Sequence, residues 1–144
     1  MKKCLNQNLY KYRGATLLEK QTKLTLVGRL KSFGYAGNGI RLMLISQQNA
    51  WLHALATLLV VVLGFILHIT FLEWCLITLA IIAVWTAEAM NTALEFLADV
   101  ASPEFNPLVG KAKDVAAGAV LITAMGAFFI GVLIFGRHLL AMFA

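Results

Sequence analysis

Four polar side chains recur at helical spacing within an otherwise apolar stretch of the sequence. They are Glu88, Asn91, Glu95 and Asp99. At 100° per residue, these positions fall within an arc of about 80° on one face of a helix. Carboxylates and an amide on one face can hold a divalent metal together with phosphate groups, or relay protons in a transporter. The spacing therefore predicts a site for one of these two kinds of chemistry.

Basic side chains follow this polar face after a short break in helical continuity. The break contains Pro103 and Pro107, and the basic residues Lys111 and Lys113 follow it. We expect the lysines to approach the carboxylates at the same depth in a membrane. At this border of the membrane, a water-soluble phosphate donor could come within reach of a lipid headgroup. Desolvation suits Glu88 to act as a base for a hydroxyl.

Other catalytic motifs are missing from the sequence. The run Gly110-Lys111-Ala112 lacks the Ser or Thr and the upstream glycine of a phosphate-binding loop, and there is no CxxC pair. The histidines His53, His68 and His138 are scattered along the chain. For isolated histidines in apolar segments we expect packing or interfacial roles rather than metal ligation.

The composition is that of an integral membrane protein. Of the 144 residues, 60% are hydrophobic and 13% are charged, whereas soluble domains average about 25% charged residues. Mean hydropathy is +0.81. A large soluble catalytic domain is excluded, because apolar spans of about 20 residues each use much of the chain.

The apolar segments predict an all-α membrane protein with an N-terminal amphipathic surface helix and three transmembrane helices. Residues 1–23 are expected to form a polar, basic tail, and residues 24–144 a single membrane domain. The surface helix is expected at about 24–48, where an apolar stripe fits either a membrane interface or a neighbouring helix. The expected spans are about 50–72, 71–100 and 113–137.

Lysine and arginine are distributed unevenly along the chain, which predicts its orientation. Nine basic residues precede the first span, Lys111 and Lys113 precede the third, and none lies between the first and second spans. By the positive-inside rule, the N-terminus and the second loop are cytoplasmic, with Arg137 a minor exception. The basic leader favours anionic lipid headgroups, and we expect no nucleic-acid partner for so hydrophobic a chain.

The polar face and the segment after it resemble the signature of a known family. The motif runs from Glu88-Ala89-Met90-Asn91 to Glu95, continues with Asp99, and resumes at Ala112-Lys113-Asp114 before an apolar span. This pattern resembles the prokaryotic diacylglycerol kinase family, which includes the undecaprenol kinases. The likeness begins upstream, at Ser32-Phe33-Gly34-Tyr35, and covers about residues 30–135.

The resemblance implies a small homotrimeric enzyme of the bacterial inner (cytoplasmic) membrane, with active sites shared between protomers. Such an enzyme transfers the γ-phosphoryl group of ATP to a lipid alcohol, undecaprenol or diacylglycerol, using Mg²⁺. By resemblance, Glu88 is the general base and Asn91 orients the reacting groups. Glu95 and Gln47 are the implied metal ligands. The implied nucleotide contacts are Tyr35, Asp99, Glu104, Lys113 and Asp114, with Asp114 holding Lys113.

Three positions depart from the family pattern. Gln47 stands where the family usually has a metal-binding glutamate, and an amide neutralises no charge. Asn106 replaces a histidine of the second loop, and Asn38 replaces a lysine. These departures leave open a weakened kinase, a shifted donor preference or a different phosphoryl chemistry.

Two other classes of function fit the same pattern. One is a non-catalytic membrane subunit whose polar face binds helices or ions. The other is a lipid phosphatase or phosphotransferase built on the same helices.

Overall fold

The computed structural model describes residues 26–104 and 106–143, and this part of the chain is helical with no strand. The helices are α2 (Leu26–Ser46), α3 (Gln48–Ile66), α4 (Phe71–Ala101) and α5 (Pro107–Phe143). The prediction of an all-α protein is confirmed. The tail expected at 1–23 lies outside the described residues, so the expected domain boundary stays a prediction.

Three of the described helices are long and apolar enough to cross a membrane: α3, α4 and most of α5. Along them, large apolar side chains such as Leu59, Leu79 and Leu133 are exposed in the single chain. A soluble domain would bury such side chains, whereas lipid tails accept them without cost. The chain is therefore a multi-pass membrane protein, as its composition predicts.

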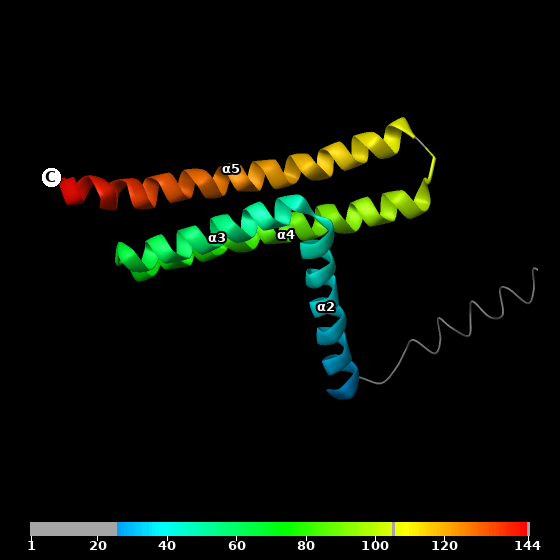
Figure 1. Cartoon of the computed structure of the whole chain (residues 1–144), viewed down its shortest axis with the longest axis horizontal. Helices are drawn as coiled ribbons and strands as arrows, with labels where there is room; N and C mark the ends of the chain where they lie inside the picture. The colour runs from blue at the N-terminus through cyan, green and yellow to red at the C-terminus, as the bar shows by residue number, and fades with distance from the viewer. Residues whose placement is uncertain (1–25, 105, 144) are drawn as a thin grey trace, which may run out of the picture. The chain divides into compact units, whose positions relative to one another are not determined.

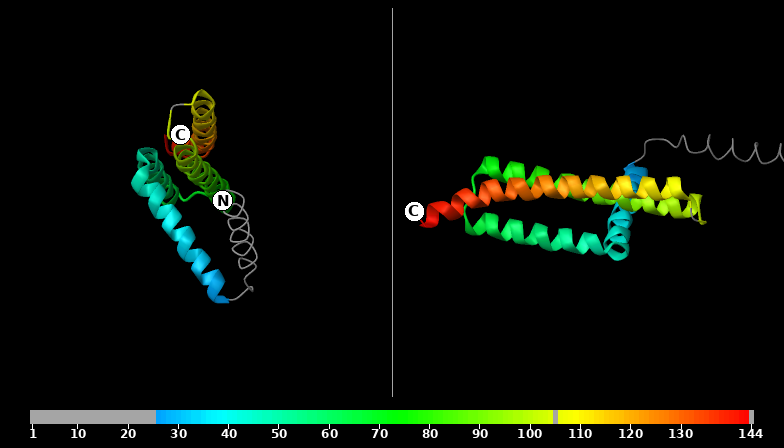
Figure 2. Two further views of the ribbon diagram at one scale, coloured as in Figure 1. Left: turned by 90° about the vertical axis from the view of Figure 1, so that its right-hand side faces the viewer. Right: turned by 90° about the horizontal axis from the view of Figure 1, so that it is seen from above.

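Contacts within the chain divide it into two units, and the boundary between them falls within α2. Residues up to Gly39 belong to the first unit, and residues from Ile40 onward belong to the second, which contains α3, α4 and α5. Within the second unit, α4 and α5 run alongside each other along much of their length (Figures 1 and 2), and α3 contacts both.

A capping box ends the turn of the α3–α4 hairpin and starts α4. Thr70 is the N-cap of α4, and its hydroxyl accepts a hydrogen bond from the backbone N–H of Glu73. The Glu73 carboxylate in turn accepts a hydrogen bond from the backbone N–H of Thr70. The expected first span reaches residue 72, whereas α3 ends at Ile66. The apolar run continues through the turn, so hydropathy alone did not mark this boundary.

The hairpin between α3 and α4 requires a glycine at position 64. A Cβ atom built on Gly64 would lie 2.8 Å from Cη2 of Trp74 and 3.2 Å from Cδ1 of Ile69. The indole ring therefore packs directly against the α3 backbone. Nearby, Ile69, Ile77, Ile134 and Phe135 form a buried apolar cluster.

Charged residues join α4 and α5 beside this hairpin. The buried carboxylate of Glu73 lies 2.9 Å from Nη2 of Arg137 and 3.2 Å from Nε2 of His138. Arg137, the exception to the positive-inside rule, is thus paired with the Glu73 carboxylate. At the other end of the α4–α5 pair, Asn106 caps α5 by accepting the backbone N–H of Leu108, and Pro107 begins the helix.

Candidate functional site

Polar residues of α3 and α4 meet at the end of the hairpin away from its turn. Gln47 contacts Glu95, and His53 approaches Glu88. In each pair the α4 residue lies about one helical turn further from the hairpin turn along the sequence than its partner, which is compatible with antiparallel helices. The hairpin therefore brings the polar face of α4 against the first turns of α3.

Glu88 is the most deeply buried polar side chain of this region. It is 1% exposed, and neither carboxylate oxygen has a hydrogen-bond partner among the described residues. Thr92 does not relieve this, because its hydroxyl donates to the backbone oxygen of Glu88 rather than to the carboxylate. A buried carboxylate without partners costs several kcal/mol, on the order of 2.5–3.5 on membrane-insertion scales. Such groups occur where a ligand or substrate completes the contacts.

Two turns further along α4, two amides converge on Glu95. Asn91 Nδ2 donates to Glu95 Oε1 over 2.9 Å, and Gln47 Nε2 donates to Oε2. The remaining oxygen of the Asn91 amide is buried and has no partner in the described part of the chain. The three side chains thus form an oxygen-rich group with one buried acceptor, Asn91 Oδ1, left unused among the described residues.

These oxygen atoms suit a hard cation. No group of three or more His, Cys, Asp or Glu side chains within residues 26–104 and 106–143 could hold a metal by itself. Mg²⁺, however, is usually held by one or two carboxylates together with substrate phosphates and water. The Glu95 carboxylate and the unpaired Asn91 Oδ1 fit that pattern, and the Gln47 amide can offer its oxygen by rotating.

A second charged pair lies near the α4–α5 loop. Nζ of Lys113 is 2.6 Å from Oδ1 of Asp99. Asp114 and Glu104 are exposed, and the contact recorded for Lys113 is with Asp99 rather than Asp114. Tyr35, on the part of α2 before Ile40, has an exposed side chain.

The structure therefore brings together some of the residues named from the sequence and leaves others apart. Glu88, Asn91, Glu95 and Gln47 lie at one end of the α3–α4 hairpin, and Asp99 joins Lys113. No recorded contact ties Glu104 or Asp114 to these groups within the described part of the chain.

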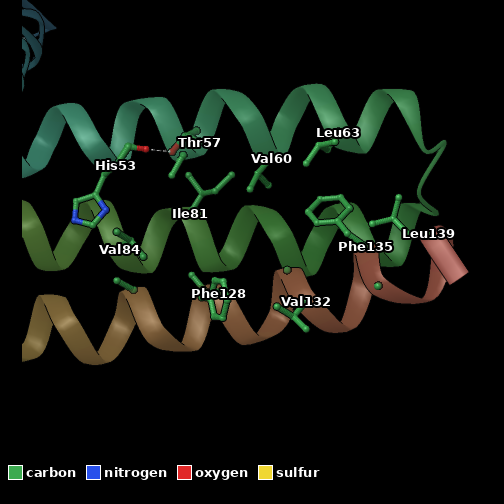
Figure 3. A pocket seen from close by; sticks show the side chains of 15 residues that line it. His53, Thr57, Val60, Leu63, Ile81, Val84, Phe128, Val132, Phe135 and Leu139 are labelled. Atoms are coloured by element: carbon green, nitrogen blue, oxygen red, sulfur yellow. Dashed lines mark hydrogen bonds between the residues drawn. The ribbon is translucent and has the colours of Figure 1, made fainter.

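An apolar groove of about 510 Å³ runs between α3, α4 and α5. Figure 3 shows His53 near one end of the groove and Leu139 near the other, with Val60 and Phe128 along its walls. Thr57 also lines the groove, but its hydroxyl donates to the His53 backbone oxygen and accepts from Trp85 Nε1. His53 is the only ionisable residue among those that line the groove. Its imidazole ring makes no hydrogen bond to the described residues.

His53 was not identified as a functional residue from the sequence. Its Nε2 lies 4.0 Å from Glu88 Oε2, and its side chain is only 18% exposed. The signal that could have revealed it was positional. Once the hairpin turn is placed at 67–70, antiparallel pairing puts position 53 within about one helical turn of position 88.

Comparisons with known proteins extend these observations. Residues 34–135 match the family model described as prokaryotic diacylglycerol kinase. The chain is 39% identical over 105 residues to an undecaprenol kinase of Bacillus subtilis (strain 168), covering 73% of this chain and 85% of that protein. It is 34% identical over 113 residues to a diacylglycerol kinase of Helicobacter pylori (strain ATCC 700392 / 26695), covering 78% and 85%. A diacylglycerol kinase of Escherichia coli (strain K12) is 28% identical over 109 residues, covering 76% and 89%.

Proposed function

The chain belongs to the prokaryotic diacylglycerol kinase family and is a lipid kinase, and on that premise we propose which reaction it catalyses. It transfers the γ-phosphoryl group of ATP to the hydroxyl of a membrane lipid alcohol, with Mg²⁺, at the cytoplasmic interface. Undecaprenol is the first acceptor to test, because the 39% identical relative is named an undecaprenol kinase. Diacylglycerol, named for the other relatives, is the alternative acceptor.

One observation carries the proposal: the buried Glu88 carboxylate, whose two oxygens have no partner in residues 26–104 and 106–143. A lipid hydroxyl entering the site would supply the missing donor. Glu88 then accepts the hydroxyl proton while the alcohol oxygen bonds to the γ-phosphorus. The bond from that phosphorus to the bridging oxygen breaks, and ADP leaves.

Glu95 and Gln47 are the proposed metal ligands. The unpaired Asn91 Oδ1 is available to the metal or the reacting groups, so Asn91 orients them. When bound, Mg²⁺ neutralises charge on the phosphate oxygens. Because Gln47 is neutral, fewer protein charges than usual hold the cation, and the phosphates must supply more of its ligands.

The nucleotide is proposed to lie toward the α4–α5 loop. Lys113 is a cation near this loop, and its ion pair with Asp99 holds the ammonium group near the end of α4. A phosphate group would compete with Asp99 for this ammonium. Asp99, Glu104, Asp114 and Tyr35 remain proposed nucleotide contacts through family resemblance.

The apolar groove is proposed to receive the hydrocarbon tail of the acceptor. Its walls are almost entirely apolar, and its polar end at His53 lies beside Glu88. A lipid lying in this groove would therefore present its hydroxyl to the base. An ATP molecule, with four charges, would not enter such a lining.

The proposed setting is the bacterial inner membrane, with the N-terminus in the cytoplasm. The lysine and arginine distribution supports this orientation, because ATP and the predicted basic loops would then share one compartment. We also propose a homotrimer. The exposed apolar faces of α3, α4 and α5 would pack partly against other copies rather than lipid.

A lipid phosphorylation assay tests the proposal. Purified protein in mixed micelles is given Mg²⁺, ATP labelled at the γ-phosphate, and either undecaprenol or diacylglycerol. We expect labelled lipid phosphate, and a loss of about 10²-fold or more in Glu88→Gln, as for removal of a general base. The thermal unfolding midpoint of Glu88→Gln should not fall, because the change removes a buried charge without partners.

Three results would contradict the proposal. If folded protein transferred no label to either lipid, the result would favour a non-catalytic subunit. Phosphate release from a lipid phosphate would favour a phosphatase. Full activity of Glu88→Gln would remove Glu88 from the reaction.

A further inference from the structure

His53 lies where the apolar groove and the buried carboxylate meet. It lines the groove from α3, and its Nε2 is 4.0 Å from Glu88 Oε2 of α4 (Figure 3 shows the ring at the groove end). No hydrogen bond from the His53 ring is recorded among the described residues. A buried carboxylate and a partly buried imidazole thus approach each other without bonding.

The distance between the two atoms lets one oxygen atom bridge them from the side. A direct hydrogen bond would need about 2.7–3.2 Å, so 4.0 Å is too long. An oxygen about 2.8 Å from both atoms closes this gap, with an angle of about 90° at the oxygen. A hydroxyl can accept from one side and donate to the other, which suits both partners.

We propose that His53 is a substrate-positioning residue, whose Nε2–H donates to the lipid hydroxyl oxygen while that hydroxyl donates its proton to Glu88. This inference rests on the proposed lipid kinase function. The remaining lone pair of the oxygen is left to form the bond to phosphorus. His53 keeps its proton throughout, and the hydroxyl proton passes to Glu88.

The hydrogen bond from His53 strengthens as the reaction proceeds. Negative charge grows on the alcohol oxygen as Glu88 takes its proton. A donor already aimed at that oxygen stabilises the transition state more than the bound substrate. Removing His53 should therefore lower kcat more than it raises the KM for the lipid.

Three variants separate this role from packing. His53→Leu removes the donor and retains an apolar side chain. His53→Gln keeps an N–H at nearly the same distance from the backbone. His68→Asn is the matched control, because His68 is an exposed histidine outside the groove with a φ of 50°, which asparagine tolerates.

We expect His53→Leu to lower kcat about 10- to 100-fold with undecaprenol, the range for losing one hydrogen bond to a charged group. His53→Gln should recover most of the loss, and His68→Asn should match the wild type. Wild-type kcat in His53→Leu would overturn the inference. So would equal losses in His53→Leu and His53→Gln, because the donor would then be irrelevant.

A second measurement does not depend on turnover. Diethyl pyrocarbonate modifies accessible imidazoles, and mass spectrometry locates the modified histidines. Undecaprenol without ATP should protect His53 and leave His68 reactive. Unchanged reactivity of His53 would overturn the inference while leaving the kinase assay intact, whereas wild-type protein inactive on every lipid alcohol would overturn the proposed function itself.

Discussion

Replacing Gln47 with glutamate would put two carboxylates together where an amide and a carboxylate now bond. Gln47 Nε2 donates to Glu95 Oε2, and Asn91 Nδ2 donates to the other oxygen of the same group. The change removes a hydrogen bond to a charged group, worth about 1.5–3 kcal/mol. It also adds repulsion of up to about 4 kcal/mol for two charges about 4 Å apart at an effective dielectric constant near 20. Without metal, Gln47→Glu should therefore unfold at a lower temperature than the wild type.

Mg²⁺ should reverse this penalty if it binds where we propose. The two carboxylates would then share one cation, so the variant gains more from metal binding than the wild type. We expect the variant to bind Mg²⁺ at least tenfold more tightly than the wild type, a difference of about 1.4 kcal/mol in binding free energy. The assays are the thermal unfolding midpoint during a Mg²⁺ titration and the Mg²⁺ dependence of lipid phosphorylation.

Gln48→Glu is the matched control for added charge. Gln48 is exposed and is the first residue of α3, where an acidic side chain interacts favourably with the helix N-terminus. It should neither lower the metal-free unfolding temperature nor change the Mg²⁺ dependence. If Gln47→Glu behaved like Gln48→Glu in both assays, Gln47 would not belong to the metal site.

Two further changes test the packing that holds the site together. Gly64→Ala should lower stability by about 1–3 kcal/mol, as for overpacking, because the added methyl would lie 2.8 Å from Trp74. In thermal unfolding, Gly126→Ala is its control, since a Cβ there meets nothing within 4 Å; equal midpoints would contradict the contact. Glu73→Gln should lower the unfolding midpoint by weakening the capping box and the contacts with Arg137 and His138. High salt should narrow that difference, and an unchanged midpoint would show that these contacts contribute little.

The sequence alone determined the helical membrane architecture and the polar face of α4. Both depend on local properties, namely the length of an apolar run and the rotation of 100° per residue. The side chains at 88, 91, 95 and 99 share one face wherever that helix lies. The family could also be recognised from the sequence, because its motif spans the polar face and the segment around Lys113.

The tertiary structure decided which of these residues meet. The apolar run continues through the first turn, so its position depends on the Thr70–Glu73 capping box rather than on hydropathy. That turn sets the pairing of α3 with α4, and hence places His53 beside Glu88 and Gln47 against Glu95. Contacts between helices depend on the register of the hairpin, which no single apolar segment encodes.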